Sequence, residues 1–429
     1  MDNDRFSSAE FKRSRSAYTI QCAVEHMVYL MVTDAFLAKL LKHIGLSDSM
    51  TGVISSLVSL AFLVQLLAIL LMQRMQNIKR TVVITDMLSM LLYMSTYLIP
   101  FIPVPGSVRT ILVFVCVLGG AVMRYLTMNM YYRWANSYVH PYKRAGFSAV
   151  KEMISLACGI LLSLAVGFVV DKLEAAGNLM MSFLLIAAVI FTLSVVNLIT
   201  LLSIKNIDAK ETASQQKSFS EVADATFRSR PFMNILVLQC IVDIATYMIT
   251  GFLGTFKTVD LLYSVGAVQL INMAGNFARL IFSKPFGSYS DRTSFANGYM
   301  VGLLLALLGV VCLVFTTNGT RWLIIVYAVL YNIAQAGVSA NSYNMMYSYV
   351  PADCFVQAQA IKSSISGALG FLASLLAGAI LKSVQANGNT FLGIRLYGQQ
   401  LLAVISAVLF LAALLFMKFV VSRQKVMKQ

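Results

Sequence analysis

Charged residues are scarce in this chain, and so are histidines and cysteines. Charged side chains make up 12% of the 429 residues, whereas hydrophobic side chains make up 59%. Soluble globular proteins carry roughly twice that charged fraction, about 25%, so a soluble globular protein is excluded. The three histidines and six cysteines lie in separate segments, without the spacing of a metal site or a disulfide framework. We therefore expect no metal and no cofactor.

Catalytic and nucleic-acid-binding patterns are missing as well. Catalysis inside a membrane would need a recognisable cluster, such as His with Asp, and none is visible, so we expect no enzyme activity. The net charge of +15 would raise the question of nucleic acid in a soluble chain. Here most basic residues lie in the tails and in alternate loops, which is the charge asymmetry of a membrane protein. No nucleic-acid partner is expected.

Twelve long apolar runs dominate the sequence, and each is long enough for a helix that crosses a lipid bilayer, which takes ~20 residues. They cover residues 18–41, 50–72, 81–102, 109–132, 147–171, 179–204, 231–256, 263–284, 295–316, 322–346, 358–384 and 396–420. The sequence thus predicts an all-α integral membrane protein. The distribution of Lys and Arg predicts that both termini are cytoplasmic and that the protein is a multi-pass protein of the plasma (inner) membrane. No cleaved signal peptide is expected.

The longest polar segment, residues 205–230, is predicted to be a cytoplasmic linker between two six-helix halves, residues 1–204 and 231–429. Sequence repeats support these halves. Lys151, Gly159 and Gly167 recur with the same spacing as Lys362, Gly370 and Gly378, and Gly177-Asn178 recurs as Gly388-Asn389. Near the start of each half, Gln21, Glu25 and Tyr29 match Gln239, Asp243 and Tyr247.

With this duplicated architecture, the chain resembles the major facilitator superfamily of secondary active transporters. Gly287, Asp291 and Arg292 are similar to the superfamily's Gly-x-x-x-Asp-Arg signature, and residues 141–146 to its Pro-x-x-Arg entry to the fifth helix. The resemblance implies two halves related by pseudo-two-fold symmetry, a monomer, and a gating role for these three residues after a tight turn at Gly287. A solvated turn is the alternative.

Eight charged residues lie within the predicted spans, where charge is expensive and marks functional sites or structural pairs. They are Glu25, Asp34, Arg124, Lys151, Glu152, Asp243, Arg279 and Lys362. Glu25 with Tyr29, and Asp243 with Tyr247, lie on polar stripes with helical spacing. Glu25 and Asp243 are therefore candidates for coupling transport to an ion, H+ or Na+. Fixed ion pairing with Arg124 or Lys151 is the alternative.

Other polar residues of the spans are candidates for substrate binding. Arg124 offers a fork of donors suited to carboxylates or sugar hydroxyls, or else pairs with Glu25 or Asp34. Lys151 and Lys362 could contact substrate or close a gate, or only extend to the interface. Asn332 and Gln335 could bind hydroxyl groups, although polar residues also hold helices together.

The sequence therefore predicts a transporter of a small polar solute, sugar or glycoside foremost, that works by alternating access. We expect it to be coupled to H+ or Na+, as in symport. An exporter of drugs or organic cations in exchange for protons is the alternative. The substrate, the direction and the stoichiometry are not encoded in any recognisable motif.

Overall fold

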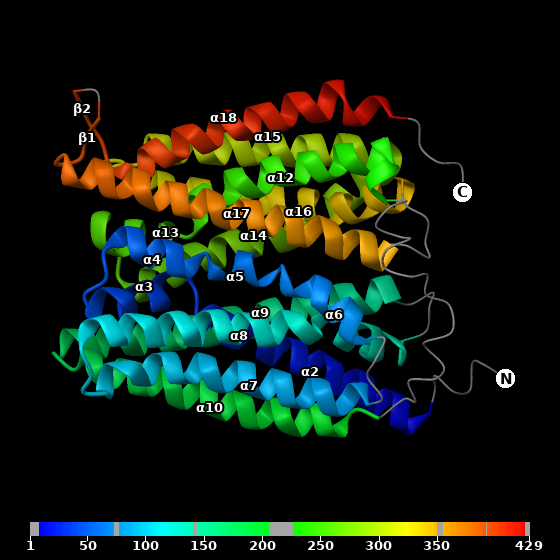
Figure 1. Ribbon diagram of the computed structural model, residues 1–429, viewed down its shortest axis with the longest axis horizontal. Helices are drawn as coiled ribbons and strands as arrows, with labels where there is room; N and C mark the ends of the chain where they lie inside the picture. The colour runs from blue at the N-terminus through cyan, green and yellow to red at the C-terminus, as the bar shows by residue number, and fades with distance from the viewer. Residues whose placement is uncertain are drawn as a thin grey trace. The chain divides into compact units, whose positions relative to one another are not determined.

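The structure is a computed structural model, and it describes residues 8–72, 77–139, 144–205, 226–349, 355–391 and 393–424. It is almost entirely helical (Figure 1). The elements are α2 (Ala9–Met31), α3 (Asp34–His43), α4 (Asp48–Ser55), α5 (Leu57–Ala61), α6 (Val64–Met72), α7 (Ile78–Leu98), η1 (Ile99–Phe101), α8 (Gly106–Asn136), α9 (Arg144–Ala175), α10 (Leu179–Ser203), α12 (Arg230–Thr250), α13 (Leu253–Thr255), η4 (Phe256–Asp260), α14 (Val265–Arg292), α15 (Phe295–Val314), α16 (Leu323–Tyr349), α17 (Phe355–Ala386), β1 (Thr390–Phe391), β2 (Ile394–Arg395), α18 (Gly398–Phe419) and η5 (Val421–Arg423).

The predicted fold class is confirmed, because helix occupies each of the twelve predicted runs. Within the described ranges, eleven helical segments are long and apolar enough to cross a membrane. The segment formed by α2 and α3 is not among them, since basic and acidic side chains lie along α2 and the helix is interrupted after Met31. The protein is thus a multi-pass membrane protein, with one short antiparallel hairpin, β1 with β2, between α17 and α18.

Several spans predicted as continuous helices are interrupted. The first breaks at Val32 and Thr33, and Asp34 then begins α3 with a φ of 48°, in the left-handed region that non-glycine residues rarely adopt. The second is divided into α4, α5 and α6. The seventh ends in a π-helical turn, η4. Backbone irregularity at membrane depth is tolerated where protein buries it.

The chain forms two compact units. Unit 1 comprises Met1–Leu46, Val64–Gln215 and Ser264–Gln269, and unit 2 comprises Ser47–Leu63, Gln216–Tyr263 and Leu270–Gln429.

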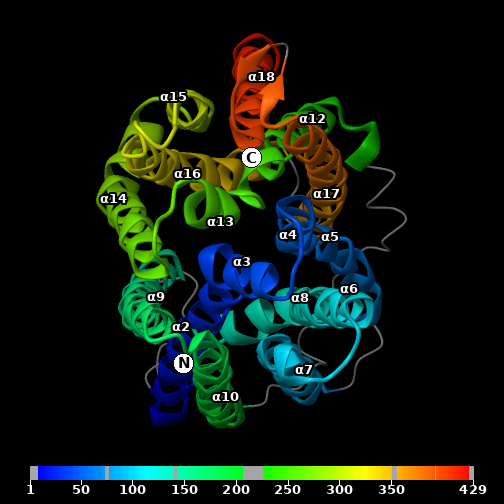
Figure 2. The ribbon, with the colours of Figure 1, turned by 90° about the vertical axis from the view of Figure 1, so that its left-hand side faces the viewer.

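In unit 1, α2 packs against α9 and α10, and α7 packs between α8 and α10 (Figure 2). One of its cores is rich in aromatic residues, with the ring of Tyr18 edge-on to Tyr131 at 5.3 Å between centroids.

In unit 2, α12 packs against α17 and α18, while α15 lies against α16 and α18. The segments α4 and α5 also pack on α17, where Ser49 Oγ donates to the Gly378 carbonyl at 2.7 Å. An extended apolar cluster, which includes Phe252, Leu303 and Phe410, fills the space between these helices.

The sequence repeat has a structural counterpart at the ends of α9 and α17. Gly177 and Gly388 follow these two helices with φ values of 74° and 66°, a conformation that ends helices and favours glycine. Gly159 on α9 faces His26 of α2, and Gly370 on α17 faces Tyr247 of α12. Corresponding helices therefore pack closely at corresponding glycines in both units.

One local expectation is wrong. Gly287 was expected to let the chain turn as it leaves the eighth span, but α14 continues through it to Arg292. Gly287 has open space around its α-carbon, and its φ is not positive, so the helix loses little by including it. Residues 206–225 of the predicted linker and residues 141–143 of the predicted turn lie outside the described residues.

Candidate functional site

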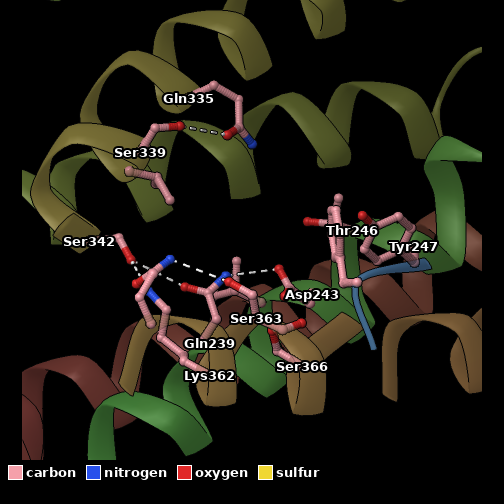
Figure 3. Close-up of a pocket in the computed structure, with 14 residues that line it drawn as sticks. Gln239, Asp243, Thr246, Tyr247, Gln335, Ser339, Ser342, Lys362, Ser363 and Ser366 are labelled. Atoms are coloured by element: carbon pink, nitrogen blue, oxygen red, sulfur yellow. Dashed lines mark hydrogen bonds between the residues drawn. The ribbon is translucent and has the colours of Figure 1, made fainter. Parts of the chain in front are cut away.

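The candidate site is a cavity of about 310 Å³ inside unit 2, bounded mainly by α12, α16 and α17 (Figure 3). Most of its lining side chains carry hydroxyl, amide or charged groups. They are Phe62, Gln239, Val242, Asp243, Thr246, Tyr247, Gln335, Val338, Ser339, Ser342, Gln359, Lys362, Ser363 and Ser366. Of the predicted site residues, Asp243, Tyr247, Gln335 and Lys362 are brought together here.

Helical spacing explains how α12 contributes its part of the lining. Gln239, Asp243 and Tyr247 are four residues apart, so they lie on one face of the helix. That face is turned toward α16 and α17, while Leu238 and Ala245 are buried on the rest of the helix. The predicted polar stripe is thus the wall of the cavity.

A hydrogen-bond chain links the two charged groups of the cavity. Lys362 Nζ donates to Ser342 Oγ at 3.0 Å, and Ser342 Oγ donates to Gln239 Oε1 at 3.2 Å. Gln239 Nε2 in turn donates to Asp243 Oδ1 at 2.9 Å. Among the described side chains, Lys362 and Asp243 form no ion pair within 4.0 Å, so neutral groups connect them instead.

The opposite wall is formed by α16. Figure 3 shows Gln335 and Ser339 facing the side that carries Asp243 and Lys362. Ser339 Oγ donates to Gln335 Oε1 at a long 3.5 Å, which leaves the amide NH2 group able to donate to a ligand. On the same helix, Tyr331 Oη donates to Thr246 Oγ1 of α12 at 3.2 Å.

The cavity therefore offers a cation at one point, an anion at another, and amides and hydroxyls between them. Hydroxyl-rich or acid-bearing solutes can satisfy such a set, because each polar group of the solute meets a partner. An apolar solute would offer no partner to the hydrogen-bonding capacity that these groups do not use among themselves, at a cost of about 1–3 kcal/mol for each buried group left unsatisfied.

Unit 1 holds a second polar cluster around Glu25. Arg124 Nη2 lies 3.7 Å from Glu25 Oε2, and the guanidinium lies over the ring of Tyr29, 5.5 Å from its centroid. Glu25, Tyr29 and Arg124 are thus brought together as one group. For Arg124 the sequence left two roles open, substrate binding and pairing with Glu25 or Asp34, and the structure contains the pair with Glu25.

Lys151 lies on α9, which packs against α2. Its ammonium donates to Tyr18 Oη at 3.0 Å and lies 4.6 Å from the centroid of that ring. Its repeat mate Lys362 donates to a serine of the cavity. The two matching lysines therefore have different hydrogen-bond partners in the two units, a tyrosine in unit 1 and a serine in unit 2.

Asp86 on α7 is a functional candidate that the sequence analysis missed. It is 5% exposed and accepts a hydrogen bond from Asn197 Nδ2 of α10. It lies only a few residues inside the predicted third span, where an acidic residue is easily taken for an interfacial one. The signal that could have found it is the pair of polar residues, Asp86 and Asn197, in otherwise apolar runs.

Two predicted binding residues lie elsewhere. Asn332 donates to the Ala328 carbonyl of its own helix at 2.8 Å and packs against Gly275, as expected of a helix-packing residue. Asp34 lies at the break between α2 and α3.

Asp291 and Arg292, the predicted gating residues, are exposed at the end of α14.

Among the described residues, no group of three His, Cys, Asp or Glu side chains could hold a metal ion.

A family model matches the part of the chain that holds most of the lining of the cavity of unit 2. Residues 235–429 match the family model described as Major Facilitator Superfamily. Human monocarboxylate transporter 6 is 27% identical over 117 residues, and this match spans 27% of the chain and only 23% of that relative.

Solved structures share the fold at low sequence identity. The nucleoside transporter NupG, in a mutant form, has a TM-score of 0.73 and 13% identity, over 94% of this chain and 99% of that one. A D-xylose-proton symporter has a TM-score of 0.73 and 14% identity, over 98% and 100%. These similarities establish the arrangement of helices and leave the ligand to be argued from the residues.

Proposed function

We propose that the chain is a transporter of the major facilitator superfamily, whose family model matches residues 235–429, and that it moves a small polar solute, sugar or glycoside foremost, by ion-coupled alternating access. The polar cavity of unit 2 carries this proposal. Its lining supplies donors and acceptors on three helices, and a volume of about 310 Å³ lies at the lower end of the range for small-molecule sites, about 300–1,000 Å³.

The chemistry of the cavity favours a hydroxylated solute over a lipophilic cation. A drug exporter would be expected to present a wide apolar surface around one acidic group. Here Asp243 already accepts a hydrogen bond from Gln239, and Lys362 places a positive charge in the same cavity. A cationic solute would meet Lys362 as a like charge. Sugars and sugar acids would meet partners on every wall.

The relatives supply two precedents for such solutes. One structural neighbour is a D-xylose-proton symporter, and the human relative is a monocarboxylate transporter by name.

For this chain we propose coupling to H+ or Na+ through Glu25, Asp243 or both. We further propose that it acts as a monomer in the plasma (inner) membrane with cytoplasmic termini, and that the α14 end with Asp291 and Arg292 acts as a gate.

Ligand binding tests the proposal directly. The detergent-purified protein is heated with panels of neutral sugars, sugar acids, other organic anions and lipophilic cations, because a ligand that binds the folded state raises Tm. We expect stabilisation by neutral sugars or sugar acids. Stabilisation by lipophilic cations alone would contradict the proposal and favour the exporter.

The variant Lys362→Gln then tests whether Lys362 binds an acidic group of the solute. Loss of a charge-assisted hydrogen bond costs about 1.5–3 kcal/mol, so the affinity for a sugar acid should fall roughly ten- to a hundredfold, with little change for a neutral sugar. Lys382→Gln is the matched control, since Lys382 is exposed on the same helix. Equal effects of the two variants would remove Lys362 from the binding site.

A further inference from the structure

A phenylalanine forms part of the wall of the polar cavity in unit 2. Of the described residues that line this cavity, Phe62 alone lies outside α12, α16 and α17. It belongs to the second predicted span, between the end of α5 at Ala61 and the start of α6 at Val64. The fold therefore brings an aromatic side chain from a distant part of the sequence to the candidate solute site.

Two residues of α17 hold Phe62 in place. Ser364 Oγ donates to the Phe62 carbonyl at 2.8 Å, and a side chain that enters the hydrogen-bond ladder of a helix is a common cause of a break. Gly367 leaves room for the ring, since a methyl group added there would lie 2.7 Å from Phe62 Cδ2. Ser363 and Ser366, beside these two residues, also line the cavity. The ring is thus positioned by a helix that itself forms a wall of the cavity.

A phenyl ring is poorly matched to a cavity that holds water alone. It carries no ordinary hydrogen-bond donor or acceptor, so water beside it loses partners, and contact with apolar groups is favoured instead. Of the other lining residues, only Val242 and Val338 are apolar. The wall therefore combines one flat apolar surface with amides, hydroxyls and two charged groups.

A sugar in its ring form matches this combination. One face of a pyranose ring is made largely of C–H groups, which can stack on an aromatic ring through dispersion and apolar burial. The hydroxyl groups project from the rim of the sugar, where lining residues such as Gln335 and Ser339 can bond to them. An open-chain polyol carries similar hydroxyl groups but has no fixed flat face. Phe62 can therefore distinguish solutes by shape rather than by their number of hydroxyl groups.

We propose that the solute is a sugar or sugar acid in its ring form, that it stacks on Phe62, and that Phe62 selects the ring form over the open chain. An acid group on the solute would bind at Lys362, and the stacking of the ring does not depend on it. This inference rests on the proposed transport of sugars, and it names the form of sugar that the cavity accepts.

Two pairs of compounds separate the ring form from the hydroxyl content. D-glucose and D-sorbitol are neutral, whereas D-glucuronate and D-gluconate are acids. In each pair the first compound is a ring in solution and the second is an open chain. The dissociation constant of each is measured by calorimetry with the detergent-purified protein. We expect wild type to bind the ring member of at least one pair roughly three- to tenfold more tightly, a ratio that corresponds to a stacked aromatic contact.

Substitutions at Phe62 test whether this ring is responsible. Phe62→Leu should lower the affinity for the ring member by roughly three- to tenfold and leave that for the open-chain member nearly unchanged. Phe62→Tyr, which keeps the aromatic face, should retain the preference. Phe191→Leu is the matched control, because Phe191 is 53% exposed on α10 of unit 1 and should change neither affinity. If the Tm without ligand shows that Phe62→Leu does not fold, Phe62→Met provides the same comparison, since methionine adapts to irregular apolar gaps.

The outcomes separate this inference from the proposed function. Equal affinity of wild type for both members of each pair, or an unchanged ratio in Phe62→Leu, overturns the role of Phe62 and leaves sugar transport as proposed. If wild type binds neither sugars nor sugar acids, the proposed function fails and this inference fails with it.

Discussion

Close packing of α17 on α12 makes Gly370 a sharp test of the structure. A methyl group added at Gly370 would lie 2.4 Å from Tyr247 Cδ2 and 3.0 Å from Cε2. Ordinary contacts begin at 3.4 Å, so the ring would have to move by about 1 Å. Forcing extra volume into a packed interior costs about 1–3 kcal/mol, and Tyr247 also lines the cavity.

We therefore expect Gly370→Ala to lower Tm by about 2–12 °C, at about 2–4 °C for each kcal/mol in a unit of this size. The measurement is thermal unfolding of the detergent-purified protein without ligand. Binding of the solute should weaken as well, because the ring that borders the cavity is displaced.

Gly287→Ala is the matched control, with the opposite expected sign. No atom lies within 4 Å of the added methyl group, and Gly287 is inside α14. Alanine in a helix is favoured over glycine by about 0.5–1 kcal/mol, so Tm should stay the same or rise slightly. Equal stability of the two variants would refute the close packing at Gly370. A large fall in the Tm of Gly287→Ala would contradict a helical Gly287 and support the tight turn expected from the sequence.

Two further substitutions test local contacts in unit 1 by the same thermal measurement. Asp171→Ala removes the carboxylate that accepts from the backbone N–H groups of Val265 and Gly266, and the lost cap should cost about 0.5–2 kcal/mol; an unchanged Tm would show that water caps this end equally well. Tyr97→Phe removes a buried hydroxyl that donates to the Met31 carbonyl, at the break between α2 and α3. It should cost about 0.5–1.5 kcal/mol, and a more stable variant would contradict that bond.

Much of the helical architecture could be predicted because the bilayer restricts the chain to helices whose apolar runs are visible in the sequence. The polar stripe through Asp243 and Tyr247 was equally readable, since helical spacing alone places both on one face. Lys362 was found because it is a charged residue within a predicted span and matches Lys151 in the sequence repeat. These are one-dimensional signals, and the structure places all three residues in the same cavity.

What the sequence could not show depends on contacts between helices. Ser342 carries no signal of its own, yet it bridges Lys362 and Gln239. The helix break after Met31 could not be predicted, because no glycine or proline lies at that point of the sequence. Gly287 is the opposite case. A glycine is typical of turns, but here the helix continues through it. In each case the deciding factor is which neighbour the fold supplies.

The two units show how a duplicated scaffold can carry different chemistry at matching positions. Glu25 and Asp243 occupy equivalent places, but Glu25 faces Arg124, while the equivalent of that arginine in unit 2 is Gln335, a neutral amide of the cavity wall. Replacing a fixed cation by an amide leaves hydrogen-bonding capacity without tying up the carboxylate, which favours binding a solute. In unit 1 the guanidinium of Arg124 instead pairs with Glu25 at 3.7 Å. This difference at one position favours the cavity of unit 2 as the proposed solute site.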